Sequence, residues 1–234
     1  MLDNAFEALK KFDWGTDLAV VAPIEDAVTA THDKSADRQD LENRLIAALK
    51  APLSRDAQDY VCRKLAIVGT AASVPALAEL LIKKENSHMA RFALERIPAS
   101  EAAAALREAL AKVNGELKIG VLSSIGSRRD SASATALASL LNDKDPAIAR
   151  AAALALGNIA NAEAAAALQA AANSATAAKQ AVVDALLSCG ESLLASNKKA
   201  DAMAIYKSLA DEQHGRLIRL AATRGMLACA GKQG

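Results

Sequence analysis

Apolar residues recur at helical spacing through most of this 234-residue chain, most clearly over residues 141–168. Asp145 and Pro146 suit a helix start, because an acid at the N-cap accepts backbone N–H bonds and proline fits the first helical position. The following run is apolar on nearly all sides and is interrupted only by Arg150, and Asn161 suits the cap of the next helix. A short helix of this kind must be covered on two sides, so we predict closely stacked helices.

Two landmarks repeat with a period of about 30 residues. One is a leucine in the first helix of each predicted pair, with steps of 29, 31 and 31 residues, and the other is a branched residue that closes the second helix, with steps of 29, 28 and 34. A unit of two helices cannot bury both of its faces alone, so neighbouring units must cover one another. The leucines are Leu77, Leu106, Leu137 and Leu168, and the branched residues are Val68, Ile97, Ile125 and Ile159.

The pattern therefore predicts an all-α protein, a right-handed α-solenoid of about five to six stacked antiparallel helix pairs. We expect N-terminal capping helices over residues 1–40, repeats over 41–190 and C-terminal capping helices over 191–234, as one continuous solenoid. At the C-terminal end the helical spacing persists while charges cover the outside, as a terminal cap requires.

Within the N-terminal cap, the spacing of apolar residues predicts one helix over residues 5–12 and another over 17–31. Pro23 lies where the second of these helices would be kinked or begin afresh. The polar segment 32–40 is expected to be a loop.

Composition supports the helical prediction and narrows the functional classes. Hydrophobic residues make up 52% of the chain but aromatic residues only 3%, and there are 11 glycines and 5 prolines. The core must therefore consist of alanine, leucine, isoleucine and valine. Charged residues make up 24% and the net charge is +1, so no strong overall field favours nucleic acid or a membrane surface.

No apolar run reaches the roughly 18 residues that are needed to cross a bilayer. The N-terminal residues contain Asp3 and lack the apolar core of a signal peptide. We therefore expect a cytoplasmic protein, or an exported one if a leader has been removed. The cysteines are Cys62, Cys189 and Cys229, an odd number within helical patterns. Buried free thiols are the favoured interpretation, and a bridge between Cys189 and Cys229 is left open.

The central units resemble HEAT repeats. The segment D-P-x-I-x-R, which comprises Asp145, Pro146, Ile148 and Arg150, is similar to the D-P-x-V-R opening of the second helix in that family. Residues 73–81, SVPALAELL, look like its usual first helix. The resemblance implies a helical solenoid and says little about function.

Two further segments extend the resemblance. Arg91, in SHMARFALERIP, matches the arginine position of the HEAT motif, while Cys62 and Ile119 stand there in two other units. Residues 200–210, ADAMAIYKSLA, are similar instead to a tetratricopeptide-repeat helix, which implies a tetratricopeptide-like C-terminal helix pair over 191–234. The sequences of residues 61–81 and 87–98 are similar to HEAT segments of large exported bacterial multidomain proteins, which implies a module of a longer chain.

The sequence offers little support for catalysis. HEAT-type hydroxylases bind iron through His-Glu pairs, but each histidine here is followed by another residue, so we expect no metal and no cofactor. Ser123, Ser124 and Ser188 have no His or Asp companions within their repeats. An enzyme of the HEAT-like DNA glycosylase or bilin lyase type remains the alternative. The histidine pairs are His32-Asp33, His88-Met89 and His214-Gly215.

A cation recurs early in each predicted second helix, and Arg219 follows near the C-terminus. One hypothesis is that these cations bridge repeats by pairing with acids. The other is that they form a basic stripe that binds an acidic segment of a partner. The candidate partner-binding residues are Arg63, Arg91, Lys118, Arg150, Lys179 and Arg219, and the candidate acids are Asp56, Asp59, Glu116, Asp145 and Asp184.

These observations favour a non-catalytic scaffold for protein–protein interaction, with a concave groove that faces another protein or a neighbouring domain. Repeats place variable residues on one continuous face, whereas chemistry needs several groups that converge in one pocket. We expect no membrane partner and regard nucleic acid as an unlikely partner, because aromatic residues are few and the net charge is near zero.

Overall fold

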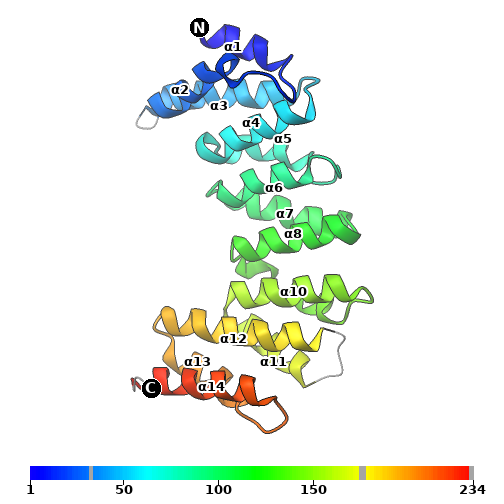
Figure 1. The fold of residues 1–234 in the computed structure, drawn as a ribbon, viewed down its shortest axis with the longest axis vertical. Helices are drawn as coiled ribbons and strands as arrows, with labels where there is room; N and C mark the ends of the chain where they lie inside the picture. The colour runs from blue at the N-terminus through cyan, green and yellow to red at the C-terminus, as the bar shows by residue number, and fades with distance from the viewer. Residues whose placement is uncertain (32–33, 174–177, 232–234) are drawn as a thin grey trace. The chain divides into compact units, whose positions relative to one another are not determined.

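The structure, a computed structural model, describes residues 1–31, 34–173 and 178–231. These residues form α-helices, short 3-10 helices, turns and loops, and no β-strand occurs among them (Figure 1). The all-α prediction is therefore confirmed. The chain divides into two compact units, Met1–Ser124 and Ile125–Gly234.

The first unit is a succession of helices that pack on their near neighbours in sequence. Helix α3 packs on α4, α4 on α6, and α5 on both α6 and α7. The elements are α1 (Leu2–Leu9), η1 (Leu18–Val20), α2 (Ala22–Ala30), α3 (Ser35–Leu49), α4 (Arg55–Val68), η2 (Ala71–Ser73), α5 (Val74–Ala78), α6 (Ser87–Arg96), α7 (Ser100–Lys112) and the larger part of α8 (Gly115–Ser127).

The second unit repeats this pairing. Helix α10 packs on α12, α11 on both α9 and α12, and α13 on both α12 and α14. Its elements after the end of α8 are η3 (Ser131–Ser133), α9 (Ala134–Ser139), η4 (Leu140–Asn142), α10 (Pro146–Ile159), α11 (Ala162–Ala172), α12 (Lys179–Ala195), α13 (Lys199–Leu209) and α14 (Arg216–Cys229).

The residues that defined the period lie in the core. All four landmark leucines are fully buried, and so are the four branched residues that close the second helices, none of them more than 6% exposed. Both predicted helix starts are also present. Asp145 accepts a hydrogen bond from the backbone N–H of Ala147 at 2.9 Å, and Asn161 accepts one from Ala164 at 2.7 Å. Local capping and the apolar period therefore agree on where these helices begin.

Polar side chains also follow the repeat. Several hydrogen bonds join residues 28 to 31 positions apart, so they tie a position in one repeat to the corresponding position in the next. One of these groups is the carboxylate of Glu42, which is only 2% exposed. Its carboxylate accepts bonds from the backbone N–H of Thr70 at 2.7 Å and from Ser73 Oγ at 2.6 Å. The other pairs are Gln58 with Asn86, Glu95 with Ser124, and Thr135 with Glu163.

The prediction of a loop over 32–40 is wrong, because α3 begins at Ser35; residues 32–33 lie outside the described residues. The segment is polar because it is the solvent-facing part of an amphipathic helix. Leu41 and Leu45 are buried on its other face, and Arg44 pairs with Asp40 one turn earlier at 2.8 Å. The polarity of residues 35–40 was therefore not sufficient to distinguish an exposed helix turn from a loop.

Helix bounds elsewhere in the N-terminal cap also shift. The first helix covers Leu2–Leu9 rather than residues 5–12. The segment 17–31 is not one helix, since a 3-10 turn over Leu18–Val20 precedes α2. Pro23 lies in the first turn of α2, so the helix begins afresh there, as proline favours.

The three cysteines are free and buried, which confirms the favoured interpretation and leaves Cys189 and Cys229 unbridged. Burial raises the pKa of the Cys62 thiol to about 12 and that of Cys189 to about 11. These thiols therefore act as small apolar core groups. Within the described residues, no helix has the length and apolar character that a membrane crossing requires.

Candidate partner-binding surface

Arg63 is the first of the predicted cations and lies in α4 with its side chain 56% exposed. Its Nε donates a hydrogen bond to Asp59 Oδ2, one turn earlier on the same helix, at 2.7 Å. Its guanidinium carbon also lies 5.4 Å from the centre of the Phe92 ring on α6. A cation at this distance from an aromatic face gains a favourable electrostatic contact, so Arg63 is fixed over the neighbouring helix while it still faces solvent.

Arg91 has a different environment. It is half-buried on α6 and reaches α8, where its guanidinium donates to the backbone oxygen of Gly120 at 2.9 Å and to Ser124 Oγ at 3.3 Å. A Cβ on Gly120 would lie 2.6 Å from the guanidinium carbon, so glycine leaves the space that Arg91 fills. Burial lowers the pKa of Arg91, and the nearby carboxylate of Glu95 opposes that shift. Arg91 therefore joins two repeats through a backbone carbonyl and a serine.

Lys118 is half-buried on α8 and forms no ion pair with another described residue. In the second unit, Arg150 on α10 and Lys179 at the start of α12 are exposed. Arg219 on α14 is half-buried, and its Nε is buried without a hydrogen-bond partner among the described residues. The binding role assigned to these residues stays a prediction.

Most of the acids that could pair with these cations bind groups of their own helix, and Glu116 lies near a lysine that precedes α6. Asp59 binds Arg63 within one helix, Asp145 caps its own helix, and Asp184 accepts a bond from Gln180 at 2.9 Å. Glu116 Oε2 lies 3.8 Å from Lys84 Nζ. Among the described residues, two predicted cations contact a neighbouring repeat: Arg63 lies over the ring of Phe92, and Arg91 bonds to α8.

Sequence reasoning missed two residues beside Arg63. Phe92 is half-buried on α6, and the guanidinium carbon of Arg96 lies 3.7 Å from the centre of its ring. Arg96 also donates to the backbone oxygen of Phe92 at 2.9 Å, which holds it in place. We call Arg63, Phe92 and Arg96 the Phe92 surface. The signal for it was the spacing of Phe92 and Arg96, which are four positions apart and therefore share one helix face.

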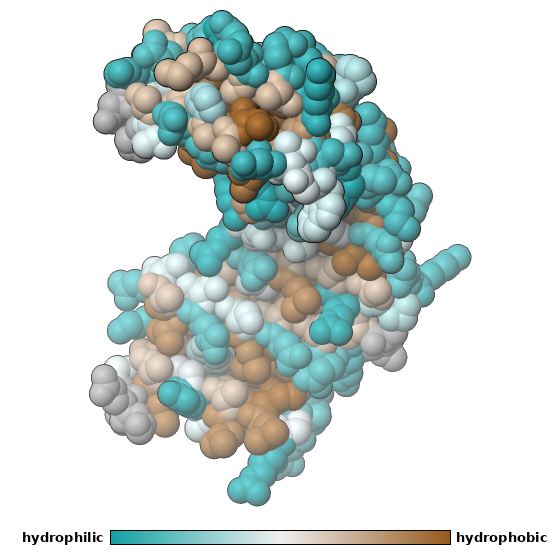
Figure 2. Space-filling model, turned by 45° about the horizontal axis from the view of Figure 1, so that its top comes forward, coloured by the Kyte–Doolittle hydropathy of each residue, from teal (hydrophilic) through white to brown (hydrophobic). Residues whose placement is uncertain are grey.

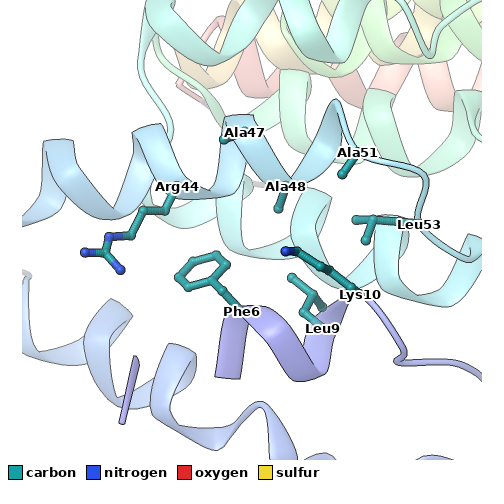
Figure 3. Close-up of a pocket in the computed structure, with 8 residues that line it drawn as sticks. All are labelled: Phe6, Leu9, Lys10, Arg44, Ala47, Ala48, Ala51 and Leu53. Carbon is teal, nitrogen blue, oxygen red and sulfur yellow. The ribbon is translucent and has the colours of Figure 1, made fainter. Parts of the chain in front are cut away.

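An apolar pocket of about 390 Å³ lies at the N-terminal end, between α1 and α3 (Figure 3). Phe6 and Leu9 point into it from α1, and Ala48 lines the opposite side. Arg44 lies at its edge, and hydrogen bonds to Asp3 and to Asp40 raise the pKa of this arginine. Its charge is thus already satisfied by acids of the same unit.

The histidines do not form a metal site within the described residues, where no group of three or more potential ligands occurs. His88 is exposed at the start of α6 and His214 is buried, while His32 lies outside the described residues. Ser124, considered above as a nucleophile, donates to Glu95 Oε1 at 2.6 Å and accepts from Arg91. Both partners lie on α6, so this serine joins α6 to α8.

Residues 103–187 match the sequence profile of HEAT repeats. This segment belongs to the HEAT repeats. The match confirms the resemblance for α7 to α12, where the D-P-x-I-x-R motif and its helix cap lie. A comparison with curated proteins gave no match.

Solved structures resemble the chain over nearly its whole length. Human deoxyhypusine hydroxylase in complex with glycerol is 15% identical with a TM-score of 0.40, and the alignment covers 99% of this chain and 96% of that one. A designed armadillo repeat protein in complex with the peptide (KR)4 is 17% identical with a TM-score of 0.35, and the alignment covers 97% and 99% of the two chains.

The surface of the chain is mixed in polarity. Figure 2 shows polar and apolar side chains interspersed over the visible face. The exposed large apolar residues include Ile67 on α4 (55%) and Leu217 on α14 (81%). Ile67 lies one turn beyond Arg63 on α4, so an apolar group and a stacked cation occupy the same helix face.

Proposed function

We propose that this HEAT-repeat chain is a non-catalytic scaffold that binds an acidic segment of another protein or of a neighbouring domain. The Phe92 surface is the observation that carries the proposal. Arginine and aromatic residues are enriched where protein partners bind most strongly, because they bury large areas and still offer polar contacts. Here two arginines are held over one ring, and both still face solvent.

The geometry also indicates the chemistry of the partner. The guanidinium groups are held in position before any partner arrives, so less side-chain entropy is lost when a carboxylate binds. Asp59 accepts a single bond, from Arg63 Nε, so the terminal N–H groups of the Arg63 guanidinium can still bind a partner. Ile67 adds an exposed apolar contact. An extended or helical segment with acidic and aliphatic residues would match this surface.

The test is a titration of a fluorescent peptide that alternates glutamate and leucine, followed by anisotropy at low and at physiological salt. The double variant Arg63→Glu/Arg96→Glu should weaken binding by about tenfold or more, since each arginine would become a repelling charge. The matched control, Lys198→Glu/Lys199→Glu, makes the same change in net charge at exposed positions of the second unit.

Equal loss in both double variants would mean that the peptide senses only the overall charge, and the Phe92 surface would have no special role. Unchanged binding in Arg63→Glu/Arg96→Glu would refute the proposal outright. Circular dichroism of each variant shows whether the helices remain intact.

A further inference from the structure

A second pocket of the first unit, of about 370 Å³, has no role in the proposal above. It lies where α6 and α8 begin, and Leu117 contributes an apolar wall. Its size lies within the range of small-molecule sites. The polar residues that line it are Lys84, Ser87, His88, Arg91, Asn114 and Glu116.

The start of α6 is open toward a ligand. Asn86 stands at the N-cap, but its side chain accepts no backbone N–H of the helix, and its Nδ2 group donates to Gln58 Oε1 of the preceding repeat. The backbone N–H of Ser87 bonds to Lys83 at 2.8 Å. The next two amides, those of His88 and Met89, have no acceptor among the described residues. Free amides at the first turn of a ten-residue helix form a favourable environment for an anion.

Ser87 supplies an independent indication. It is 1% exposed, and its Oγ has no hydrogen-bond partner within the described part of the chain. Buried hydroxyl groups nearly always have a partner, so one without a partner that lines a pocket points to a ligand atom. Arg91, one turn further along α6, also has a buried Nε without a partner.

The charges around the pocket are mostly positive. Lys84 and Arg91 are cationic, His88 is exposed beside them, and Asn114 can donate through its amide. Glu116 is the opposing charge, and Lys84 lies 3.8 Å from it. A bound anion would compete with Glu116 for Lys84, because both side chains line the pocket.

We propose that this pocket binds the phosphate group of a phosphate monoester. The lining offers the amide of His88, a hydroxyl, a guanidinium N–H and an ammonium group, which exceed the needs of one carboxylate and suit the three acceptor oxygens of a phosphate. The pocket also exceeds the volume of a bare phosphate ion, so it has room for the group that carries the ester. This inference does not depend on the Phe92 surface. The residues of that surface, Arg63 on α4 and Phe92 and Arg96 on α6, do not line the pocket.

The test measures binding of inorganic phosphate, phenyl phosphate and a neutral peptide with one phosphoserine by calorimetry. We expect phenyl phosphate or the phosphopeptide to bind with saturation and more tightly than inorganic phosphate. The better of the two identifies the source of the group, a small molecule or a modified protein segment. The same peptide with glutamate in place of phosphoserine should bind at least about tenfold more weakly.

Two variants locate the site. Ser87→Ala should weaken binding by about fivefold without lowering the free energy of unfolding, because the lost hydroxyl has no hydrogen-bond partner among the residues that the structure describes. Lys84→Gln should weaken binding by about tenfold, while Lys83→Gln, an exposed neighbour outside the pocket lining, should leave it unchanged. Arg91 is not varied here because it also joins α6 to α8.

Equal affinity of the unaltered chain, Ser87→Ala and Lys84→Gln would overturn the proposal, as would the absence of saturable binding of any phosphate ester. Arg63→Glu/Arg96→Glu should retain phosphate binding. Loss of peptide binding in that double variant with retention of phosphate binding would separate the two proposals.

Discussion

Arg91 decides how the cationic positions of this chain should be tested. A charge reversal there would be an obvious probe of a basic stripe, but the structure predicts that it would damage the fold. The guanidinium donates to the backbone oxygen of Gly120 at 2.9 Å and to Ser124 Oγ at 3.3 Å, so it ties α6 to α8. We predict that replacing Arg91 destabilises the first unit whether or not a partner exists.

The magnitude follows from these contacts. Loss of a charged donor costs about 1.5–3 kcal/mol per hydrogen bond, and partial exposure favours the lower end. The bond to Ser124 counts only in part, because Ser124 keeps its bond to Glu95. Removal of the partnerless Nε returns about 1 kcal/mol of desolvation. Arg91→Met, which keeps the apolar stem, should therefore cost about 2 kcal/mol, and Arg91→Glu more, because Glu95 would then face a like charge one turn away.

The assay is urea unfolding followed by helical ellipticity, with Arg150→Met as the matched control. Arg150 belongs to the same set of predicted cations but is exposed on α10. Its replacement should change the unfolding free energy by less than about 0.5 kcal/mol. Equal stability of Arg91→Met and Arg150→Met would refute the structural role of Arg91. It would also restore Arg91 as a valid probe of partner binding.

Two further predictions concern packing and the buried thiols. Gly157→Ala should lower the unfolding free energy by about 1 kcal/mol, because the added Cβ would lie 2.9 Å from a backbone oxygen of α12 and the overpacking outweighs the gain in helix propensity; a more stable variant in urea unfolding would contradict this. Cys62 and Cys189 should react with a thiol reagent at pH 8 far more slowly in the native chain than in urea, because burial raises the pKa of the two thiols to about 12 and about 11. Burial of the two neutral thiols contributes stability that is fully present below their ordinary pKa of 9.0 and is lost as the pH rises through the raised values, so the urea midpoint should fall as the pH rises from 9.0 to about 12. Rapid labelling of the native chain at pH 8 would show that the helices around these thiols open.

The sequence predicted the helices best where a periodic apolar residue marks the buried side and a nearby polar residue caps the helix. Leu77 and Leu106 recur with the period and are fully buried, because residues at these positions face the next helix. Asp145 caps α10 by a bond to its own first turn, which needs no distant information. The start of α3 was missed because the polar residues 35–40 look the same on a solvated helix face as in a loop. A helix face and a loop are distinguished here only by the residues that pack against the segment.

The candidate sites were less predictable, because they depend on contacts between repeats. The spacing of cations located Arg63, and a search for an aromatic residue four positions before an arginine would have found Phe92. Nothing in the sequence indicates that Ser87 Oγ is buried without a partner among the described residues, or that Asn86 leaves its helix uncapped and donates to Gln58. Those facts arise from the packing of α6 against the preceding repeat.

A repeat period selects positions and does not by itself assign their roles. Arg63 and Arg91 are 28 residues apart in equivalent helices, yet one faces solvent over Phe92 and the other is half-buried against Gly120. The same spacing places Glu42 in the core, where it binds the next repeat through Thr70. Each repeat must bond to its neighbour somewhere, so a polar ladder in phase with the period is expected for structural reasons alone. Exposure therefore separates residues that are free to bind a partner from those that hold the stack together, and on that criterion Arg63 and Arg96 are better functional probes than Arg91.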